Sequence, residues 1–149
     1  MRPVEHVAAS IVTSGIFYGA TGSLPGTISC LISGILIDVD HHLDLWLHEK
    51  KFLWKIKDVY HFCDEDRAGK LHLIFHSYEL LALFWLILTV LRLGNFWWGI
   101  AIGATVHLIL DQIFNRLKPG TYFLSYRWQN GFSKACVFPA EHYQKQKQR

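Results

Sequence analysis

Aspartate and histidine residues gather in a short stretch near position 40 of the chain. Asp38, Asp40 and His41 directly follow an uncharged run over residues 24–37. Two carboxylates and an imidazole within four residues are ligands that suit Zn²⁺, Mn²⁺ or Fe²⁺. Asp38 and His41 are three residues apart, so they would share one face at the end of a helix. The stretch therefore predicts a site for a divalent metal.

Two later stretches also combine imidazoles with carboxylates at helical spacing. His72 and His76 are four residues apart, would share a helix face, and are followed by Glu79. His107 and Asp111 have the same spacing within an otherwise apolar segment. An ionisable pair at membrane depth costs free energy, which makes it a functional candidate by default.

Each of these groups also has a structural interpretation. His72 and His76 could be solvated residues at a polar helix end. His107 and Asp111 could form a self-satisfied pair that bridges helices, and the carboxylates near position 40 could simply end a helix. His6, near the start of the first apolar segment, indicates little by itself.

The apolar pattern predicts four helices, over residues 4–20, 26 to 38 or 40, 71–93 and 96–115. The run over 80–91 is a strong membrane signal, whereas the first two helices are shorter than the ~20 residues of a full span. In an antiparallel bundle joined by short turns, the start of the first helix lies beside the end of the second. The start of the third helix and the end of the fourth lie at the same end of the bundle. That end of the bundle would gather His6 and the three groups described above.

We therefore expect an all-α fold, a membrane-embedded four-helix bundle that forms a single domain over residues 1–149. Residues 43–70 mix aromatic side chains with lysines and are predicted to form an interfacial amphipathic segment between the second and third helices. A solvated connecting helix is the alternative for that segment. The tail over 121–149 is expected to be partly irregular.

The composition agrees with a membrane location. Hydrophobic residues make up 51% of the 149 residues and charged residues 18%, which is more apolar than a typical soluble domain. The net charge of +3 is too small to indicate a nucleic-acid partner. Among the 15 Lys and Arg residues only Arg92 lies near the turns opposite the predicted site. The positive-inside rule then predicts a multi-pass inner-membrane protein with its site and both termini in the cytoplasm.

The predicted site has two kinds of member. One or more divalent ions, with Zn²⁺ expected, would be bound by His6, Asp38, His41, His72, His76, His107 and Asp111. Asp40 and Glu79 are predicted to act as general base or to orient a ligand, because metal-bound imidazoles usually need a carboxylate partner.

The order of these motifs resembles that of a bacterial family of small inner-membrane proteins described as membrane-bound metal-dependent hydrolases. That family is grouped distantly with zinc-dependent phospholipase C and related single-strand nucleases. The resemblance covers about residues 4–120, with a weaker similarity over 122–128, and implies a hydrolase without naming its substrate. Residues 72–76 depart from the family pattern, since they lack its Arg-Gly and are one residue shorter. The matching positions are His6, Asp38, Asp40, His41, His72, His76, Ser77, His107 and Asp111.

The expected function is hydrolysis of a phosphoester or ester of a lipid-like substrate at the cytoplasmic membrane interface, with membrane lipids as partners. A non-catalytic metal-binding or metal-transporting membrane protein is the alternative. A transport route needs polar groups across the full depth of the membrane, and the far halves of the third and fourth helices are apolar. A third interpretation is an apolar soluble bundle whose histidines are structural.

Overall fold

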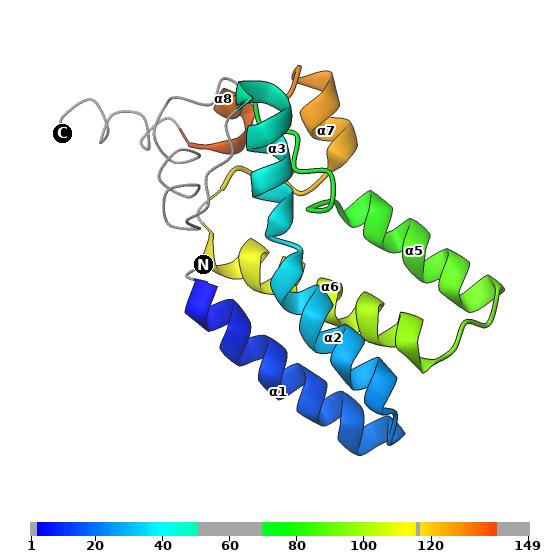
Figure 1. The fold of residues 1–149 in the computed structure, drawn as a ribbon. Helices are drawn as coiled ribbons and strands as arrows, with labels where there is room; N and C mark the ends of the chain where they lie inside the picture. Colours follow the sequence, from blue (N-terminus) through cyan, green and yellow to red (C-terminus); the bar gives the residue numbers. More distant parts are fainter. Residues whose placement is uncertain (1–2, 51–69, 116, 140–149) are drawn as a thin grey trace. The chain divides into compact units, whose positions relative to one another are not determined.

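The computed structural model describes residues 3–50, 70–115 and 117–139. These residues form helices joined by turns, with no strand among them, which confirms the predicted all-α class (Figure 1). The chain divides into two compact units, which are described separately. Unit 1 comprises Met1–Ile37 and Tyr78–Asn115, and unit 2 comprises Asp38–Ser77 and Arg116–Arg149. A single domain over the whole chain stays a prediction.

Unit 1 holds four helices, α1 (Pro3–Thr21), α2 (Leu24–Leu36), α5 (Tyr78–Val90) and α6 (Asn95–Phe114). Helices α1, α2 and α6 pack against one another, and α5 packs on α6 (Figure 1). The Ser23 hydroxyl caps α2 by accepting a hydrogen bond from the Gly26 N–H, and a proline follows Ser23 in the first turn. The bounds of α1 and α6 agree closely with the first and fourth predicted helices.

Glycines bring α2 and α6 into close backbone contact. A Cβ atom at Gly99 would overlap the carbonyl oxygen of Gly26, and one at Gly103 would overlap that of Cys30. Gly99 and Gly103 are four residues apart, the small-xxx-small spacing that lets helix backbones approach closely. This spacing is visible in the sequence and is a signal that the sequence analysis did not use.

The buried face of α1 is mostly polar. It carries His6, Ser10, Ser14 and Phe17, spaced so that they line one side of the helix. Many large apolar side chains of unit 1 point outward instead, although Leu88 and Leu108 are buried. The exposed ones include Val12, Ile16, Leu24, Ile28, Ile32, Leu83, Leu86, Val90 and Ile113. Small and polar residues inside with large apolar residues outside are typical of helices packed in lipid.

One helix of the described residues, α6, is both long enough and apolar enough to cross a membrane. Helices α2 and α5 are apolar but shorter. Length and composition alone therefore leave the membrane-embedded four-helix bundle as a proposal.

Unit 2 holds α3 (Val39–Glu49), α7 (Leu124–Gln129) and α8 (Lys134–Val137). Its core consists of Leu45, Leu71, Cys136 and Val137, against which Leu117, Tyr126 and Phe138 pack. Burial raises the pKa of the Cys136 thiol, although Arg127 and Lys118 oppose this shift, so the thiol packs as a neutral group.

Two predicted boundaries are wrong within the described residues. The second helix ends at Leu36, and a separate helix, α3, begins at Val39 and carries Asp40 and His41. The third predicted helix begins at Tyr78 instead of residue 71. The described part of the tail holds the short helices α7 and α8 with turns between them. Residues 51–69 and 140–149 lie outside the described residues, so the interfacial segment over 43–70 is described only up to residue 50.

The close contact between α2 and α6 yields a stability prediction. Gly103→Ala should lower the free energy of unfolding by about 1–3 kcal/mol, because the new methyl group meets backbone atoms of α2 that cannot move aside. Gly19→Ala is the matched control, since nothing lies within 4 Å of a Cβ atom there. It should leave stability unchanged or raise it by up to about 1 kcal/mol. Denaturant titration in detergent micelles measures both, and equal effects would contradict the close approach.

Candidate metal site

Two histidines and an aspartate meet inside unit 1. The Nε2 atom of His6 lies 3.0 Å from Oδ1 of Asp111, and Nε2 of His107 lies 3.5 Å from Oδ2 of the same carboxylate. The two imidazole rings stack with centroids 4.0 Å apart. All three residues are at most 4% exposed. Residues from the start of α1 and the end of α6 therefore share one buried cluster.

A backbone carbonyl determines which nitrogen of His107 carries the proton. Nδ1 of His107 lies 2.8 Å from the carbonyl oxygen of Gly34, in the last turns of α2. A carbonyl oxygen only accepts hydrogen bonds, so Nδ1 must be the donor. In the neutral ring Nε2 then has a lone pair, and that lone pair faces the Asp111 carboxylate, which is a second acceptor. A cation between Nε2 and the carboxylate, either a proton or a metal ion, makes this arrangement favourable.

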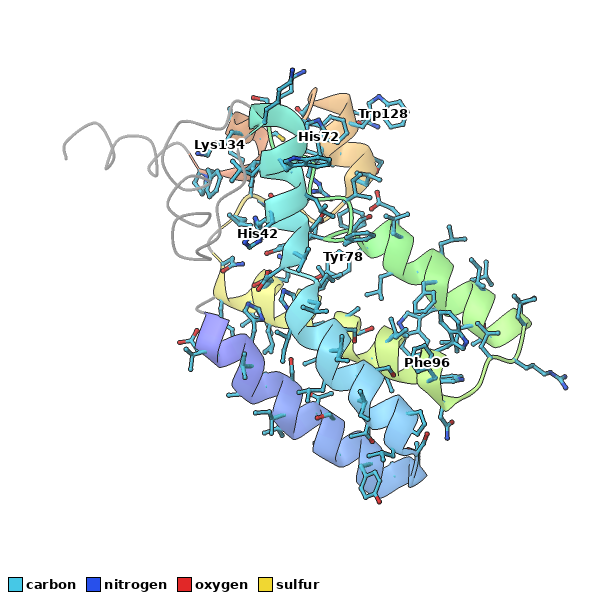
Figure 2. The ribbon with its side chains drawn as sticks, in the orientation of Figure 1. His42, His72, Tyr78, Phe96, Trp128 and Lys134 are labelled. Carbon is cyan, nitrogen blue, oxygen red and sulfur yellow. The ribbon has the colours of Figure 1, made fainter. Side chains whose placement is uncertain are left out.

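Tyr78 packs near the same end of unit 1. Its hydroxyl, at the start of α5, donates a hydrogen bond to the carbonyl oxygen of Leu108 on α6 over 3.4 Å (Figure 2). The start of α1 and the ends of α2 and α6 meet in the cluster described above, and the start of α5 is bound to α6 next to His107. Antiparallel connectivity predicts this convergence.

Unit 2 contains a second imidazole arranged in the same way. The Asp40 carboxylate accepts hydrogen bonds from the backbone N–H groups of Phe75, over 2.7 Å, and of His76, over 3.3 Å. It also lies 3.4 Å from Nδ1 of His76. On its other side, Nε2 of His76 lies 3.6 Å from Oδ1 of Asp38. Asp40 therefore orients the His76 ring so that Nε2 faces a carboxylate, as a carboxylate behind a metal-bound imidazole does.

The remaining predicted residues occupy different positions. The His41 ring meets the His76 ring edge-on with centroids 5.1 Å apart. His72 is bound to Asp44, since its Nδ1 lies 2.9 Å from Oδ1 of that carboxylate. Glu79 lies in the first turn of α5, half-buried, and its role as a base stays a prediction.

The prediction that His72 and His76 share a helix face is wrong. Residues 71–77 form a turn before α5, because the carboxylates of α3 bind backbone N–H groups that a helix would use internally. Asp44 accepts the N–H of His72, and Asp40 accepts those of Phe75 and His76.

Arg127 holds this turn from the other side, and it is a residue that the predicted site did not include. Its guanidinium donates to the carbonyl oxygens of His72, Leu73 and His76. Arg127 is 1% exposed. Leu73 has a left-handed backbone with φ of 41°, which costs roughly 1–2 kcal/mol in a non-glycine residue. The Arg127 side chain thus stabilises the turn that carries His76.

The residue types of each cluster fit a metal ion. His107 and Asp111 in unit 1 are buried, and so is His76 beside Asp38 in unit 2. Imidazole nitrogens and carboxylate oxygens suit Zn²⁺, Mn²⁺ and Fe²⁺ alike. Buried carboxylates are costly unless a cation compensates them, so a divalent ion would stabilise these residues.

Comparison with known proteins does not identify a family for this chain. No protein-family model, no curated protein and no solved structure matches it. The function is therefore argued from the geometry of the two clusters.

The contacts of Arg127 generate a stability prediction. Arg127→Met should lower the free energy of unfolding by about 2–4 kcal/mol, because three buried carbonyl groups lose a charged donor. Hydrogen exchange at the amides of Phe75 and His76 should speed up as the turn loosens. The matched control is Arg92→Met, at an exposed position, which should change stability by less than about 0.5 kcal/mol. An Arg127 variant as stable as this control would contradict the assigned role.

Proposed function

We propose that this chain is a membrane-bound, metal-dependent hydrolase that cleaves a phosphoester or ester of a lipid-like substrate at the cytoplasmic face of the inner membrane. Each unit holds a candidate cluster of ligands. That of unit 1 consists of His6, His107 and Asp111, and that of unit 2 consists of Asp38, His76 and His41. The resemblance to the family of membrane-bound metal-dependent hydrolases agrees with this proposal.

One observation carries the metal proposal. In each unit, the Nδ1 atom of an imidazole is turned toward an acceptor and its Nε2 atom toward a carboxylate. His107 does this with Gly34 and Asp111, and His76 does it with Asp40 and Asp38. An arrangement in which one acceptor faces another is unfavourable unless a cation lies between them. That it occurs twice, with buried carboxylates each time, favours a bound divalent ion.

The proposed chemistry assigns a role to each group. A divalent cation bound in such a cluster would supply Lewis acidity and lower the pKa of a bound water toward neutrality. Nε2 of His107 and the Asp111 carboxylate would hold it in unit 1, and Nε2 of His76 and the Asp38 carboxylate would hold it in unit 2. Asp40 keeps the His76 ring in the required tautomer and orientation. Asp38, whose side chain is 20% exposed, gives the cluster of unit 2 its most open side for substrate.

A membrane location is supported by the surface of unit 1. Its outward-facing side chains are large and apolar, its buried face on α1 carries serines, and α6 is long and apolar enough to cross a bilayer. Because a site at the end of helices embedded in lipid would lie at the membrane interface, we expect a lipid-like substrate.

A non-catalytic metal-binding protein is the second candidate. It is favoured by the low exposure of His76, His107 and Asp111, at 2–4% each, since structural metal sites are closed whereas catalytic sites keep a position open. Turnover of a substrate separates the two candidates.

His107→Gln tests the metal proposal directly. The glutamine amide can still donate to the carbonyl of Gly34 but offers no imidazole lone pair, so affinity for Zn²⁺ should fall by more than about 100-fold. The matched control is His42→Gln, which also replaces an imidazole but lies outside the proposed ligands and should bind Zn²⁺ as the wild type does. Elemental analysis of detergent-purified protein gives the metal content, and hydrolysis of aryl phosphodiesters and aryl esters gives the activity. Unchanged metal content in His107→Gln would refute the site, and metal binding without turnover would favour the non-catalytic candidate.

Leu86→Lys tests whether the outer face of unit 1 meets lipid. Leu86 lies in α5 and is 58% exposed. In a bilayer the lysine should cost about 2–3 kcal/mol and reduce the inserted fraction. In water the same change should alter stability by less than about 0.5 kcal/mol. Carbonate extraction of membranes measures insertion, with Trp128→Lys in unit 2 as the matched exposed control. Equal recovery of both variants in the membrane-free fraction would contradict the proposed location.

A further inference from the structure

A histidine–aspartate dyad lies in unit 2 beside the turn that carries His76. Nδ1 of His72 is 2.9 Å from Oδ1 of Asp44, and the backbone N–H of His72 donates to Oδ2 of the same carboxylate over 2.9 Å. The Asp44 side chain is 5% exposed. Because both of its oxygens bind one residue, the position and tilt of the His72 ring are closely determined.

The His72 ring differs from the rings in the metal clusters by its exposure. Its side chain is 20% exposed, compared with 3% for that of His76. One face of the ring stacks on Phe132 with centroids 4.3 Å apart. The backbone N–H of Leu71 donates to the carbonyl oxygen of Phe132 over 2.9 Å, which binds the backbone of Phe132 to the residue before His72.

The two histidines of the turn are held by a common side chain. Arg127 donates to the backbone carbonyl groups of both His72 and His76. The dyad therefore keeps a constant position relative to His76 and, through it, to the Asp38 carboxylate. Among the described residues, the charged groups that contact His72 include the carboxylate of Asp44 on α3, at the ring and the backbone N–H, and the guanidinium of Arg127 on α7, at the backbone carbonyl.

We propose that His72, oriented by Asp44, is the general acid that protonates the leaving group in the hydrolysis. This inference rests on the proposed function and deepens it, because it replaces a predicted metal ligand with a catalytic residue. Asp44 accepts a hydrogen bond from Nδ1 whichever charge the ring carries. Nε2 is therefore the ring nitrogen that we assign to proton transfer to the leaving group, as in other dyads that orient an imidazole through a buried carboxylate.

The step balances as follows for a phosphodiester. The oxygen of water forms a bond to phosphorus, and the bond between phosphorus and the leaving oxygen breaks with its electron pair passing to that oxygen. Nε2 of protonated His72 transfers its proton to the leaving oxygen, which departs as a neutral alcohol. The proton lost by the attacking water passes to solvent, and His72 takes up a proton from solvent before the next turnover.

A purely structural dyad would only tie the turn to α3. The bond from Asp44 to the His72 backbone N–H already does this, and the contact with the ring nitrogen is additional. Removal of a general acid lowers the hydrolysis rate most for substrates whose leaving group must be protonated before it can depart. Removal of a purely structural contact has no such dependence on the leaving group.

The experiment compares phenyl and 4-nitrophenyl phosphodiesters with Zn²⁺-loaded protein in detergent micelles. His72→Gln should lower the rate on the phenyl substrate by about 10²–10⁴-fold. It should lower the rate on the 4-nitrophenyl substrate by less than about tenfold, because 4-nitrophenolate leaves without a proton. Asp44→Asn should act in the same direction. Phe132→Leu, which removes the stacked ring alone, should not change the ratio of the two rates, and all three variants should keep their Zn²⁺.

Each outcome decides between the two proposals. If His72→Gln lowers both rates equally, changes neither, or loses Zn²⁺, His72 is not the general acid and the inference is overturned while the hydrolase stands. If the wild type binds Zn²⁺ but cleaves neither probe nor any aryl ester, the proposed function fails and this inference fails with it.

Discussion

The hydrogen bond from Nδ1 of His107 to the carbonyl oxygen of Gly34 is the constraint on which the rest of the site depends. It determines the tautomer of a buried imidazole by means of a backbone group that cannot change its role. Once Nδ1 is the donor, Nε2 becomes an electron-pair donor directed at Asp111. The preference for a cation in this cluster follows from that single bond, whatever the surrounding helices are embedded in.

That hydrogen bond is possible only because the helix axes are close together. Gly99 and Gly103 of α6 pack against backbone atoms of α2, and Gly34 packs against Ser10 of α1. Larger side chains at these positions would separate the helices and move His107 away from its acceptor. The same packing leaves little room where α2 meets α6, and many large apolar side chains of unit 1 lie on its outer surface. The close packing of the helices therefore accounts for the position of the polar cluster, and it accompanies the apolar outer surface of unit 1.

The sequence predicts unit 1 better than unit 2, and the reason is physical. Helical periodicity and short turns depend on local sequence, so the bounds of α1 and α6 and the meeting of His6 with His107 and Asp111 could be predicted. The non-helical turn at 71–77 could not, because its sequence is compatible with a helix. It departs from a helix because Asp40 and Asp44 bind its N–H groups and Arg127, 51 to 55 residues later, binds its carbonyl groups. Interactions between residues so far apart leave no trace in periodicity. The separate roles of His72 and His76 were not predicted for the same reason.

Anomalous X-ray diffraction from crystals of Zn²⁺-loaded protein, recorded at the zinc edge, tests the central claim most directly. The account predicts a zinc peak about 2.0–2.2 Å from Nε2 of His107 and from a carboxylate oxygen of Asp111. The absence of a peak there, with Nε2 of His107 and the carboxylate closed to hydrogen-bonding distance, would show that a proton occupies the place assigned to the metal.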